Sequence, residues 1–141
     1  MDQTEQNIAV VQAALQTVFT EHRLDQIDYY FAPEFVQYSP YAAPGGREEL
    51  KQWWAAVVAA IPGVTTTVEQ VVADDERVAT FRVVRGAVRG TLPGLGISGS
   101  GQDVEFRVAD IFAVQKGKIV AHWEVADTGP FARLATAEPG Q

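Results

Sequence analysis

The amino-acid sequence predicts an α+β fold in a single domain, and two observations lead to this prediction. Apolar residues recur at helical spacing as far as Ile61 and at the two-residue spacing of strands from Thr65 onward. Helices that precede a run of antiparallel strands typically cover one face of the sheet that those strands form. A chain of 141 residues is typical of one domain, residues 1–141, and can bury a sizeable apolar core.

Three helices are expected in the first part of the chain. The first is predicted to begin with Thr4 as its N-cap, and the second is short and closes at Pro33. The third covers residues 47–61 and stops at Pro62-Gly63. The apolar side chains that these helices should bury are Ile8, Val11, Leu15, Val18, Phe19, Ile27, Tyr30, Phe31, Leu50, Trp53 or Trp54, Val57 and Ile61.

The strands follow in the second part. β-branched and alternating patterns predict strands over residues 65–73, 77–90, 103–114 and 118–126. An extended piece that enters a Pro/Gly loop is expected before the third helix, over residues 35–46, and a short terminal helix over residues 131–137. Together these elements predict an antiparallel sheet with helices on one face.

The composition excludes several classes of function. The chain has no cysteine, which excludes disulfides, thiolate metal sites and a cysteine nucleophile and fits a reducing, cytoplasmic location. The start of the sequence lacks the basic region of a signal peptide, and no apolar run approaches the roughly 20 residues that span a bilayer. A net charge of -7 makes nucleic acid or an anionic membrane a poor partner. A neutral or apolar small molecule, or another protein, is the expected partner.

The ribbon VADIFAVQKGKIVAHWEVAD, residues 108–127, carries three ionisable side chains within apolar sequence: Asp110, His122 and Glu124. Side chains alternate between the two faces of a strand, so the length of the turn decides which residues share a face. A three-residue loop, 115–117, places all three ionisable groups on one face, with Asp110 opposite His122. That face is expected to carry Phe106, Val108, Asp110, Phe112, Val120, His122, Glu124 and Ala126, and the opposite face Ala109, Ile111, Ala113, Ile119, Ala121 and Trp123.

A two-residue loop, Lys116-Gly117, remains open as an alternative. It requires Lys116 in a backbone conformation that suits Asn or Asp better, and it would turn His122 and Glu124 toward solvent. Asp110 could also cap a backbone group. Both faces of the three-residue arrangement are apolar, so both need covering. Because the helices can cover only one face, a second copy of the chain is expected on the other.

Three stretches resemble the SnoaL-like polyketide cyclase and ester cyclase family of the nuclear transport factor 2-like fold. They are FVQYSPYAAPGGREELKQWW, VVRGAVRGTLPGLGISGSGQDV and RVADIFAVQKGKIVAHWEVAD. The resemblance implies a cone-shaped α+β barrel around a deep apolar pocket, a homodimer through the outer face of the sheet, and chemistry that usually needs no cofactor. Related proteins include cyclases, isomerases, dehydratases and epoxide hydrolases.

Carried over by position, the resemblance places Asp110 where related pockets hold a histidine or a carboxylic acid. Glu124 stands where the cyclases hold their acid/base aspartate, and His122 matches the histidine of that motif. The chain departs from the family at Tyr38 and Val88, where relatives often have histidines. The dyad of the ketosteroid isomerases is also missing, since Leu15 and Ser39 fall near those places, which makes steroid isomerisation by that route a poor fit.

These residues predict acid/base chemistry in an apolar pocket. Desolvation and a neighbouring carboxylate are expected to raise the pKa of Asp110, which could then donate a hydrogen bond to a carbonyl. Glu124, paired with His122, would take a proton from carbon, and Tyr38 would supply a second donor to the enolate. The expected reaction is ring closure of aldol or Michael type on a polyketide-like substrate. The expected substrate-binding residues are Trp54, Phe106, Val108, Phe112, Val88 and Phe19.

Other functions stay open. The pocket could act mainly as a template that folds a polyene or polyketide, or as a non-catalytic ligand-binding or accessory module. Each of Trp53 and Trp54 could equally be a core residue. A metal site is not expected, because the chain's other histidine, His22, lies in a distant loop. The Gly/Ser-rich residues 94–101 lack the Lys and helix of a phosphate loop, so they are a lip of the pocket or a plain connector.

Overall fold

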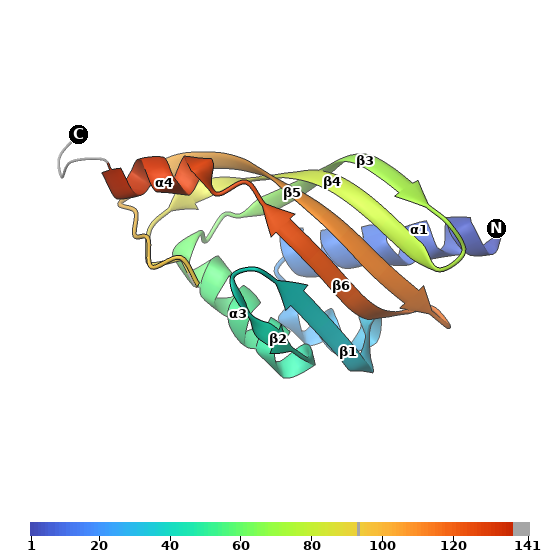
Figure 1. Cartoon of the computed structure of the whole chain (residues 1–141). Coiled ribbons are helices and arrows are strands. Elements are labelled where there is room, and N and C mark those ends of the chain that lie inside the picture. The colour runs from blue at the N-terminus through green and yellow to red at the C-terminus, as the bar shows by residue number, and fades with distance from the viewer. Residues whose placement is uncertain (93, 137–141) are drawn as a thin grey trace.

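Six strands form one strongly curved sheet in the order β2-β1-β6-β5-β4-β3 (Figure 1). β1 pairs in parallel with β6, and the other neighbouring strands are antiparallel. The computed structural model describes residues 1–92 and 94–136 of the chain. The α+β prediction is confirmed. The strands are β1 (Phe31–Ser39), β2 (Ala42–Gly45), β3 (Thr65–Ala73), β4 (Arg77–Val88), β5 (Gln102–Gln115) and β6 (Lys118–Ala126).

The helices α1 and α3 lie against one face of the sheet, and α4 lies at one end of the sheet (Figure 1). Asp2, not Thr4, caps α1, because its carboxylate accepts the backbone N–H of Glu5 at 2.8 Å. The predicted terminal helix forms α4, and Ala137 lies outside the described residues. The helical segments are α1 (Gln3–Ala14), the π-helical η1 (Leu15–Thr20), the 3-10 helix η2 (Leu24–Gln26), α2 (Ile27–Tyr30), α3 (Arg47–Ala60) and α4 (Gly129–Thr136).

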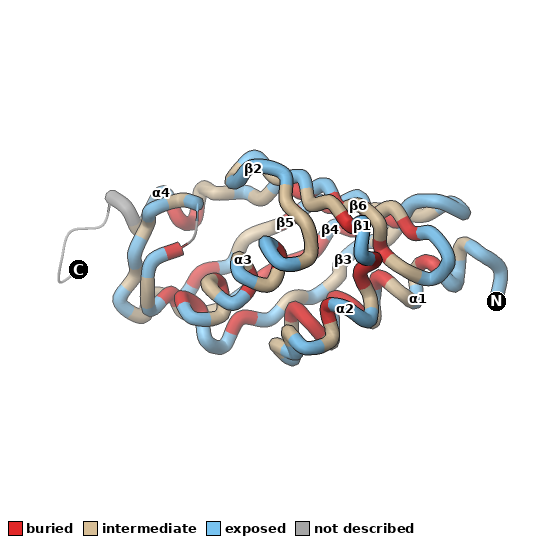
Figure 2. The backbone as a smooth tube through the Cα atoms, turned by 90° about the horizontal axis from the view of Figure 1, so that it is seen from below, coloured by how far each residue is buried: buried red, intermediate tan, exposed pale blue. Residues whose placement is uncertain are grey.

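The apolar core fills the space between these helices and the sheet, and buried positions line both layers (Figure 2). Phe31 and Phe35 of β1 meet edge to face at 4.8 Å between ring centroids, which joins the edge of the sheet to the helices. The largest fully buried side chains include Phe31, Phe35, Phe112, Leu15, Ile27, Ile61 and Ile119. Burial of this kind stabilises the fold by roughly 1.5–3 kcal/mol for each large apolar side chain.

The turn between β5 and β6 corrects the predicted register. Gln115 pairs with Lys118, so the loop has two residues, Lys116 (φ 51°) and Gly117 (φ 75°). A turn of this length alone would have moved His122 to the other face. An irregularity in the ladder lies just beyond it, where Val114 pairs with Ile119 and Ala113 with Ala121, which leaves Val120 without a partner.

The additional residue restores the faces. Beyond Val120, Asp110 pairs with Glu124 and Phe112 with His122, so the polar side chains share the inner face as expected. The assignment of Ile119 to the outer face was wrong, because Ile119 precedes the irregularity and is fully buried in the core. The predicted pairing of Asp110 with His122 was wrong by two residues, a shift that leaves the faces of the residues beyond Val120 unchanged.

We expect Gly117→Val to destabilise the protein by about 1–2 kcal/mol, the cost of a left-handed residue other than glycine. A Cβ at Gly117 would meet no atom within 4 Å, so the backbone conformation is the source of the cost. Urea denaturation measures the change. The matched control is Lys116→Asn, which keeps the turn and suits the left-handed conformation. Equal stability of Gly117→Val and the parent protein would show that residue 117 is not left-handed in solution.

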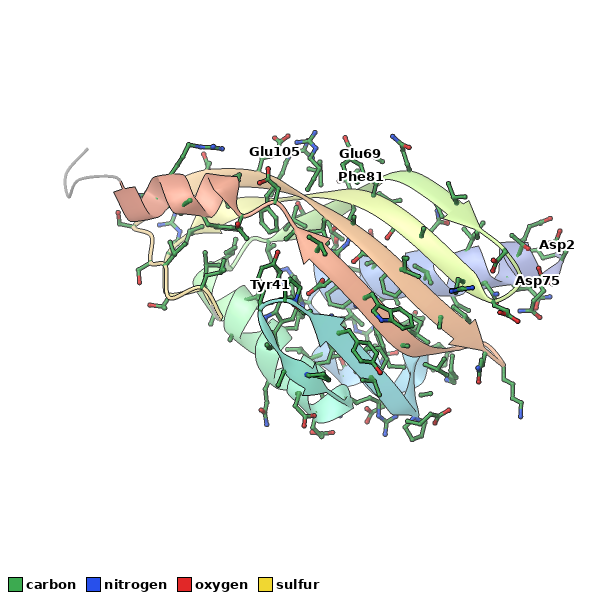
Figure 3. All side chains as sticks on the ribbon, viewed as in Figure 1. Asp2, Tyr41, Glu69, Asp75, Phe81 and Glu105 are labelled. Carbon is green, nitrogen blue, oxygen red and sulfur yellow. The ribbon has the colours of Figure 1, made fainter. Side chains whose placement is uncertain are left out.

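The outer face of the sheet exposes large apolar side chains. Ile111, Trp123 and Val125 are 45%, 42% and 62% exposed, and Tyr38 stacks on Trp123 with 5.3 Å between ring centroids. Farther along this face, Glu69, Phe81 and Glu105 also point away from the helices (Figure 3). Within the described residues, none of the helices combines the length and the apolar character that crossing a bilayer requires.

Candidate functional site

Three neighbouring strands bring four ionisable side chains together on the inner face of the sheet. Arg82 comes from β4, Asp110 from β5, and His122 and Glu124 from β6. Strand pairing puts Thr80 beside Asp110 and Asp110 beside Glu124. Arg82 and His122 occupy the next inward positions of β4 and β6, so the four ionisable groups form a short, staggered row across the sheet. All four are buried. Two positive and two negative charges leave the row neutral when His122 is protonated, an arrangement that lowers the cost of burying ions.

Asp110 lies at the centre of this row. Its carboxylate accepts two hydrogen bonds from Arg82, from Nε at 2.8 Å and Nη2 at 3.0 Å, and a third from the hydroxyl of Thr80 at 2.8 Å. His122 Nε2 lies 2.7 Å from Oδ1 of Asp110. The side chain has no solvent exposure. Asp110 is therefore held in place by the protein and closed off from the pocket.

The electrostatics of Asp110 overturn the predicted proton donor. Burial alone would raise the pKa of Asp110, but the charge of Arg82 and the hydrogen bonds from His122 and Arg82 outweigh burial and hold this pKa well below its usual range. Burial likewise acts to lower the pKa of Arg82, while the charges of Asp110 and Glu124 raise it above its ordinary value. Asp110 is therefore a carboxylate at neutral pH and cannot donate a hydrogen bond to a substrate.

His122 links this buried carboxylate to the pocket. Its ring stacks on Phe112 with centroids 4.1 Å apart, which fixes its plane. Nδ1 lies 2.8 Å from Oε1 of Gln37, on the parallel neighbour β1. In its protonated form the ring donates to both Asp110 and Gln37. Since Oε1 of Gln37 accepts from His122, the amide nitrogen Nε2 is left to donate elsewhere, and among the described residues no protein acceptor binds it.

Glu124 is the carboxylate that the pocket can use. Its side chain is 6% exposed, and Oε2 lies 3.5 Å from Nη2 of Arg82. Within the described part of the chain this ion pair is its single polar contact, in contrast with the four contacts of Asp110. Glu124 also lines the pocket directly. It is therefore positioned by Arg82 and still has an oxygen available to a bound molecule.

The pocket lies between the inner face of the sheet and α3. Its polar groups gather on β1, β4 and β6, and its remaining walls are mostly aromatic and aliphatic. Phe106 of β5 packs against Phe131 of α4 at 4.5 Å between ring centroids, which carries the apolar wall to the end of the sheet. The apolar lining residues are Phe19, Leu50, Trp53, Trp54, Val57, Ile61, Val84, Leu92, Leu95, Phe106, Val108, Ala126 and Phe131.

Phe19 reaches the pocket through an irregular helix. The segment Leu15–Thr20 is π-helical, and the carbonyl of Val18 accepts a hydrogen bond from the indole Nε1 of Trp54 at 3.0 Å. The Phe19 ring packs edge to face on Trp54 with 4.8 Å between centroids and lies 5.9 Å from the guanidinium carbon of Arg82. A single π-helical turn is often found at functional sites, and here it places an aromatic ring over the buried cation.

The structure places most of the predicted residues in the pocket and moves others out of it. The residues found in its lining are Glu124, His122, Trp54, Phe106, Val108 and Phe19. Phe112 lies behind His122, and Asp110 lies between His122 and Arg82, so neither reaches the cavity. Val88, at the end of β4, is fully buried and is not among the pocket-lining residues. Its carbonyl lies so close to Gly99 that a Cβ on that glycine would come within 2.7 Å of it.

The expectation that Tyr38 faces the pocket was wrong. Tyr38 is 38% exposed on the outer face of the sheet, where its ring stacks on Trp123. Its neighbour Gln37 points inward, because successive side chains of a strand point to opposite faces. Tyr41, after β1, does line the pocket, and its hydroxyl binds both the N–H and the C=O of Ala126 at 2.8 Å (Figure 3).

Arg82 and Gln37 were missed by the sequence reading. Arg82 stands in the run FRVVRG, where alternation places it on the same face as Thr80 and Val84. An arginine on a buried face needs an acidic partner, and the next strand in the sequence provides one in Asp110. Gln37 is two residues from the buried Phe35 and therefore shares its face of β1, a signal that could have identified it.

The oxygen and nitrogen ligand atoms of Asp110, His122 and Glu124 all lie within 4.8 Å of one another, a spacing that could suit a metal ion. Arg82 argues against this use. Its guanidinium already pairs with both carboxylates, and His122 Nε2 is bonded to Asp110. A divalent ion would have to displace that cation, so the residues fit an arginine-centred ion pair better than a metal site.

The Gly/Ser-rich segment after β4 forms a lip of the pocket, which was one of the two predicted alternatives. Leu92 and Leu95 line the cavity, and the segment folds back on itself through the bond from the N–H of Leu92 to the carbonyl of Ile97 at 2.8 Å. The Thr91 and Ser98 hydroxyls also meet at 2.8 Å. The segment therefore closes one side of the pocket with apolar side chains.

Residues 9–133 match the model of a family described as SnoaL-like polyketide cyclase. The chain belongs to this family. The match spans most of the chain and confirms the resemblance found in the sequence. A search of curated proteins found no match.

Solved structures of similar proteins agree with the SnoaL-like fold. A protein of Jannaschia sp. CCS1, described as a candidate SnoaL-like polyketide cyclase, is 20% identical, with a TM-score of 0.87 over 99% of this chain and 97% of its own. IdmH of Streptomyces antibioticus, described as a candidate polyketide cyclase, is 25% identical, with a TM-score of 0.76 over 89% and 95%. An LEH-like epoxide hydrolase of M. tuberculosis is 18% identical, with a TM-score of 0.72 over 95% and 92%. The SnoaL-like family and these names support an enzyme.

Proposed function

We propose that the protein is a cofactor-independent cyclase or isomerase that moves a proton in an apolar, polyketide-like carbonyl compound. The observation that carries this proposal is the difference between the two carboxylates. Asp110 is enclosed by four polar contacts, whereas Glu124 has one contact and lines an apolar pocket. A carboxylate in such a place is suited to act as a general base toward carbon.

The proposed reaction begins with the substrate carbonyl at the polar end of the pocket. Its oxygen accepts a hydrogen bond from Nε2 of Gln37, whose orientation is set by His122 and, behind it, Asp110. Glu124 removes a proton from the carbon next to the carbonyl, and the enolate oxygen stays bound to Gln37. The enolate carbon then attacks a second electrophilic carbon of the same molecule, which closes the ring. The negative charge that develops on the electrophilic group takes up the proton from Glu124, which restores the carboxylate. Arg82 and Asp110 position these groups without touching the substrate.

A second candidate function is templating, with or without catalysis, and the apolar walls favour it. Aromatic rings from η1, α3, β5 and α4 surround the cavity. Holding two reacting ends together can lower a barrier by up to roughly 7–11 kcal/mol in the best intramolecular cases. Under templating, Trp54→Ala and Phe131→Ala should damage binding and change the products, while Glu124→Gln should be mild. Proton chemistry predicts the reverse order.

Binding of 2-naphthol tests the proposed polar end, because this apolar aromatic enol resembles the intermediate. We expect 2-naphthol to bind about tenfold more tightly than naphthalene, which lacks the oxygen, as one hydrogen bond of roughly 1–1.5 kcal/mol allows. Gln37→Leu should remove this difference and leave naphthalene binding unchanged. Fluorescence titration measures all four affinities. A preference for 2-naphthol that survives in Gln37→Leu would show that Gln37 is not the oxygen donor.

The proposal includes a homodimer through the outer face of the sheet, because Ile111, Trp123 and Val125 are large apolar side chains exposed there. Light scattering at micromolar concentration should give twice the monomer mass of 15.3 kDa. Trp123→Lys should shift the protein toward the monomer, while Glu34→Lys, an exposed change on the neighbouring strand β1, should not. A monomer mass for the parent protein would refute the dimer.

A further inference from the structure

A second, smaller cavity lies between β2 and α3, directly beside the substrate pocket. Gln37, Leu50, Trp53 and Glu124 line both cavities. These four residues therefore form the partition between the two spaces. Glu124 can be approached from the apolar pocket on one side and from the smaller cavity on the other.

The lining of the smaller cavity differs from that of the pocket. Beyond the shared partition it holds only small or polar residues, which are Ser39, Ala42, Ala43, Gly45 and Glu49. Its volume of about 50 Å³ suits a few water molecules, since one water needs roughly 10–15 Å³ of such space. Glu49 is exposed and anchored, because its carboxylate accepts the N–H of Gly46 at 3.1 Å. The cavity is therefore open to water and smaller than the main pocket.

Among the described residues, no protein group near Glu124 can take up a proton from it. Arg82 is a donor only, and its charge is stabilised by both carboxylates. The two ring nitrogens of His122 are already engaged by Asp110 and Gln37. An apolar substrate would also keep water out of the main pocket. A proton on Glu124 can therefore exchange with solvent during turnover only by another route.

We propose that the cavity between β2 and α3 is a water site through which Glu124 exchanges its proton with solvent while the main pocket holds an apolar molecule. This inference rests on the proposed function. The protonated carboxyl group of Glu124 transfers its proton to a water molecule in the cavity, and the resulting hydronium passes to bulk water beside Glu49. The carboxylate is restored, and no electrons are transferred.

Filling the cavity tests the inference. Ala42→Leu with Ala43→Leu introduces bulk from the exposed strand β2, and Ala42→Ser with Ala43→Ser is the matched control that leaves the space open. The measurement is the exchange with water of the side-chain amide protons of Gln37, followed by NMR in protein saturated with 2-naphthol and again in free protein. Gln37 lies in the partition, so its exchange reports on water in the cavity.

We expect the leucine variant with 2-naphthol bound to exchange on the order of tenfold more slowly than the serine variant and the parent protein. Equal exchange in the leucine and serine variants, with or without 2-naphthol, would overturn the inference. Glu124→Gln separates this result from the proposed function. It should abolish proton transfer to carbon and leave the exchange of Gln37 unchanged, so either assignment can fail while the other stands.

Discussion

Glu124→Gln is expected to lower the catalytic constant for proton removal from carbon by roughly 10²–10⁴-fold, the usual contribution of a general base. The amide has the same shape and can still accept from Arg82, but it cannot take a proton. 5-Nitrobenzisoxazole is a suitable probe, because a base opens its ring by removing one C–H proton and the product is coloured. Its affinity should change little, since the apolar walls are intact.

Glu105→Gln is the matched control for this experiment. Glu105 is an exposed carboxylate on the outer face, paired with Arg85 and Arg107. Its loss should leave the rate of ring opening unchanged. If Glu124→Gln retains the parental rate, proton removal is not carried out by Glu124, and templating by the apolar walls becomes the better explanation.

Arg82→Met is expected to lower the free energy of unfolding by about 3–5 kcal/mol, the cost of leaving one member of a buried ion pair uncompensated. The substitution keeps much of the side-chain volume and removes the two hydrogen bonds to Asp110 and the ion pair with Glu124. Urea denaturation at neutral pH measures the change.

Two further variants test whether the uncompensated charge of Asp110 causes this loss of stability. Adding Asp110→Asn to Arg82→Met should recover a large part of it, because the amide carries no charge and can still accept from Thr80. Arg85→Met, which breaks an exposed pair with Glu105, should change stability by less than about 0.5 kcal/mol. A loss in Arg82→Met no larger than that in Arg85→Met would contradict the central role of this ion pair.

The pH dependence of stability follows from the same pair. The pKa of Asp110 is lowered in the folded state, so its stabilising contribution is fully present above the unfolded value of about 3.9 and is lost as the pH falls toward the folded pKa. In Arg82→Met the opposing charge is gone and burial should raise this pKa instead. The difference in stability between the parent and the variant should therefore shrink as the pH falls, first through the raised pKa of Asp110 in the variant and further below about 4, where the parent loses the contribution of Asp110. A difference that is constant down to pH 3 would exclude Asp110 as its source.

Periodicity was enough to predict β3 to β6 and most of the inner face, whereas β1 begins at Phe31, inside the helix that was expected to close at Pro33. The register was predicted for a reason that proved wrong. A three-residue turn was expected because Lys116 is a poor left-handed residue, and the chain adopts that conformation nonetheless. The unpaired Val120 then restores the face of His122 and Glu124. The shorter turn and the unpaired Val120 each shift the register by one residue. The two shifts together keep the side chains beyond Val120 on their predicted face, although their cross-strand partners differ from the prediction. Tertiary packing of Ile119 in the core is the feature that sequence spacing could not show.

The site itself was predicted in part. Glu124 and His122 were placed correctly, but the protonation of Asp110 depends on a partner from another strand, and the contribution of Arg82 becomes visible only once β4 is paired with β5. Tyr38 was predicted as a donor for its phenol, but alternation along β1 turns it to the face opposite Gln37. Local pattern therefore predicted two of the strands that carry the site, β5 and β6, while the charges within it depend on contacts between residues far apart in the sequence.

The exchange of α-protons in 2-tetralone, an apolar aromatic ketone, tests the role of Glu124 most directly, because enolisation is the step that ring closure requires. The ketone is incubated with protein in deuterated water, and NMR follows the incorporation of deuterium next to the carbonyl. We predict exchange well above background with the parent protein and with Glu105→Gln, and background exchange with Glu124→Gln. Equal exchange in the parent and Glu124→Gln would contradict the assignment of Glu124 as the base.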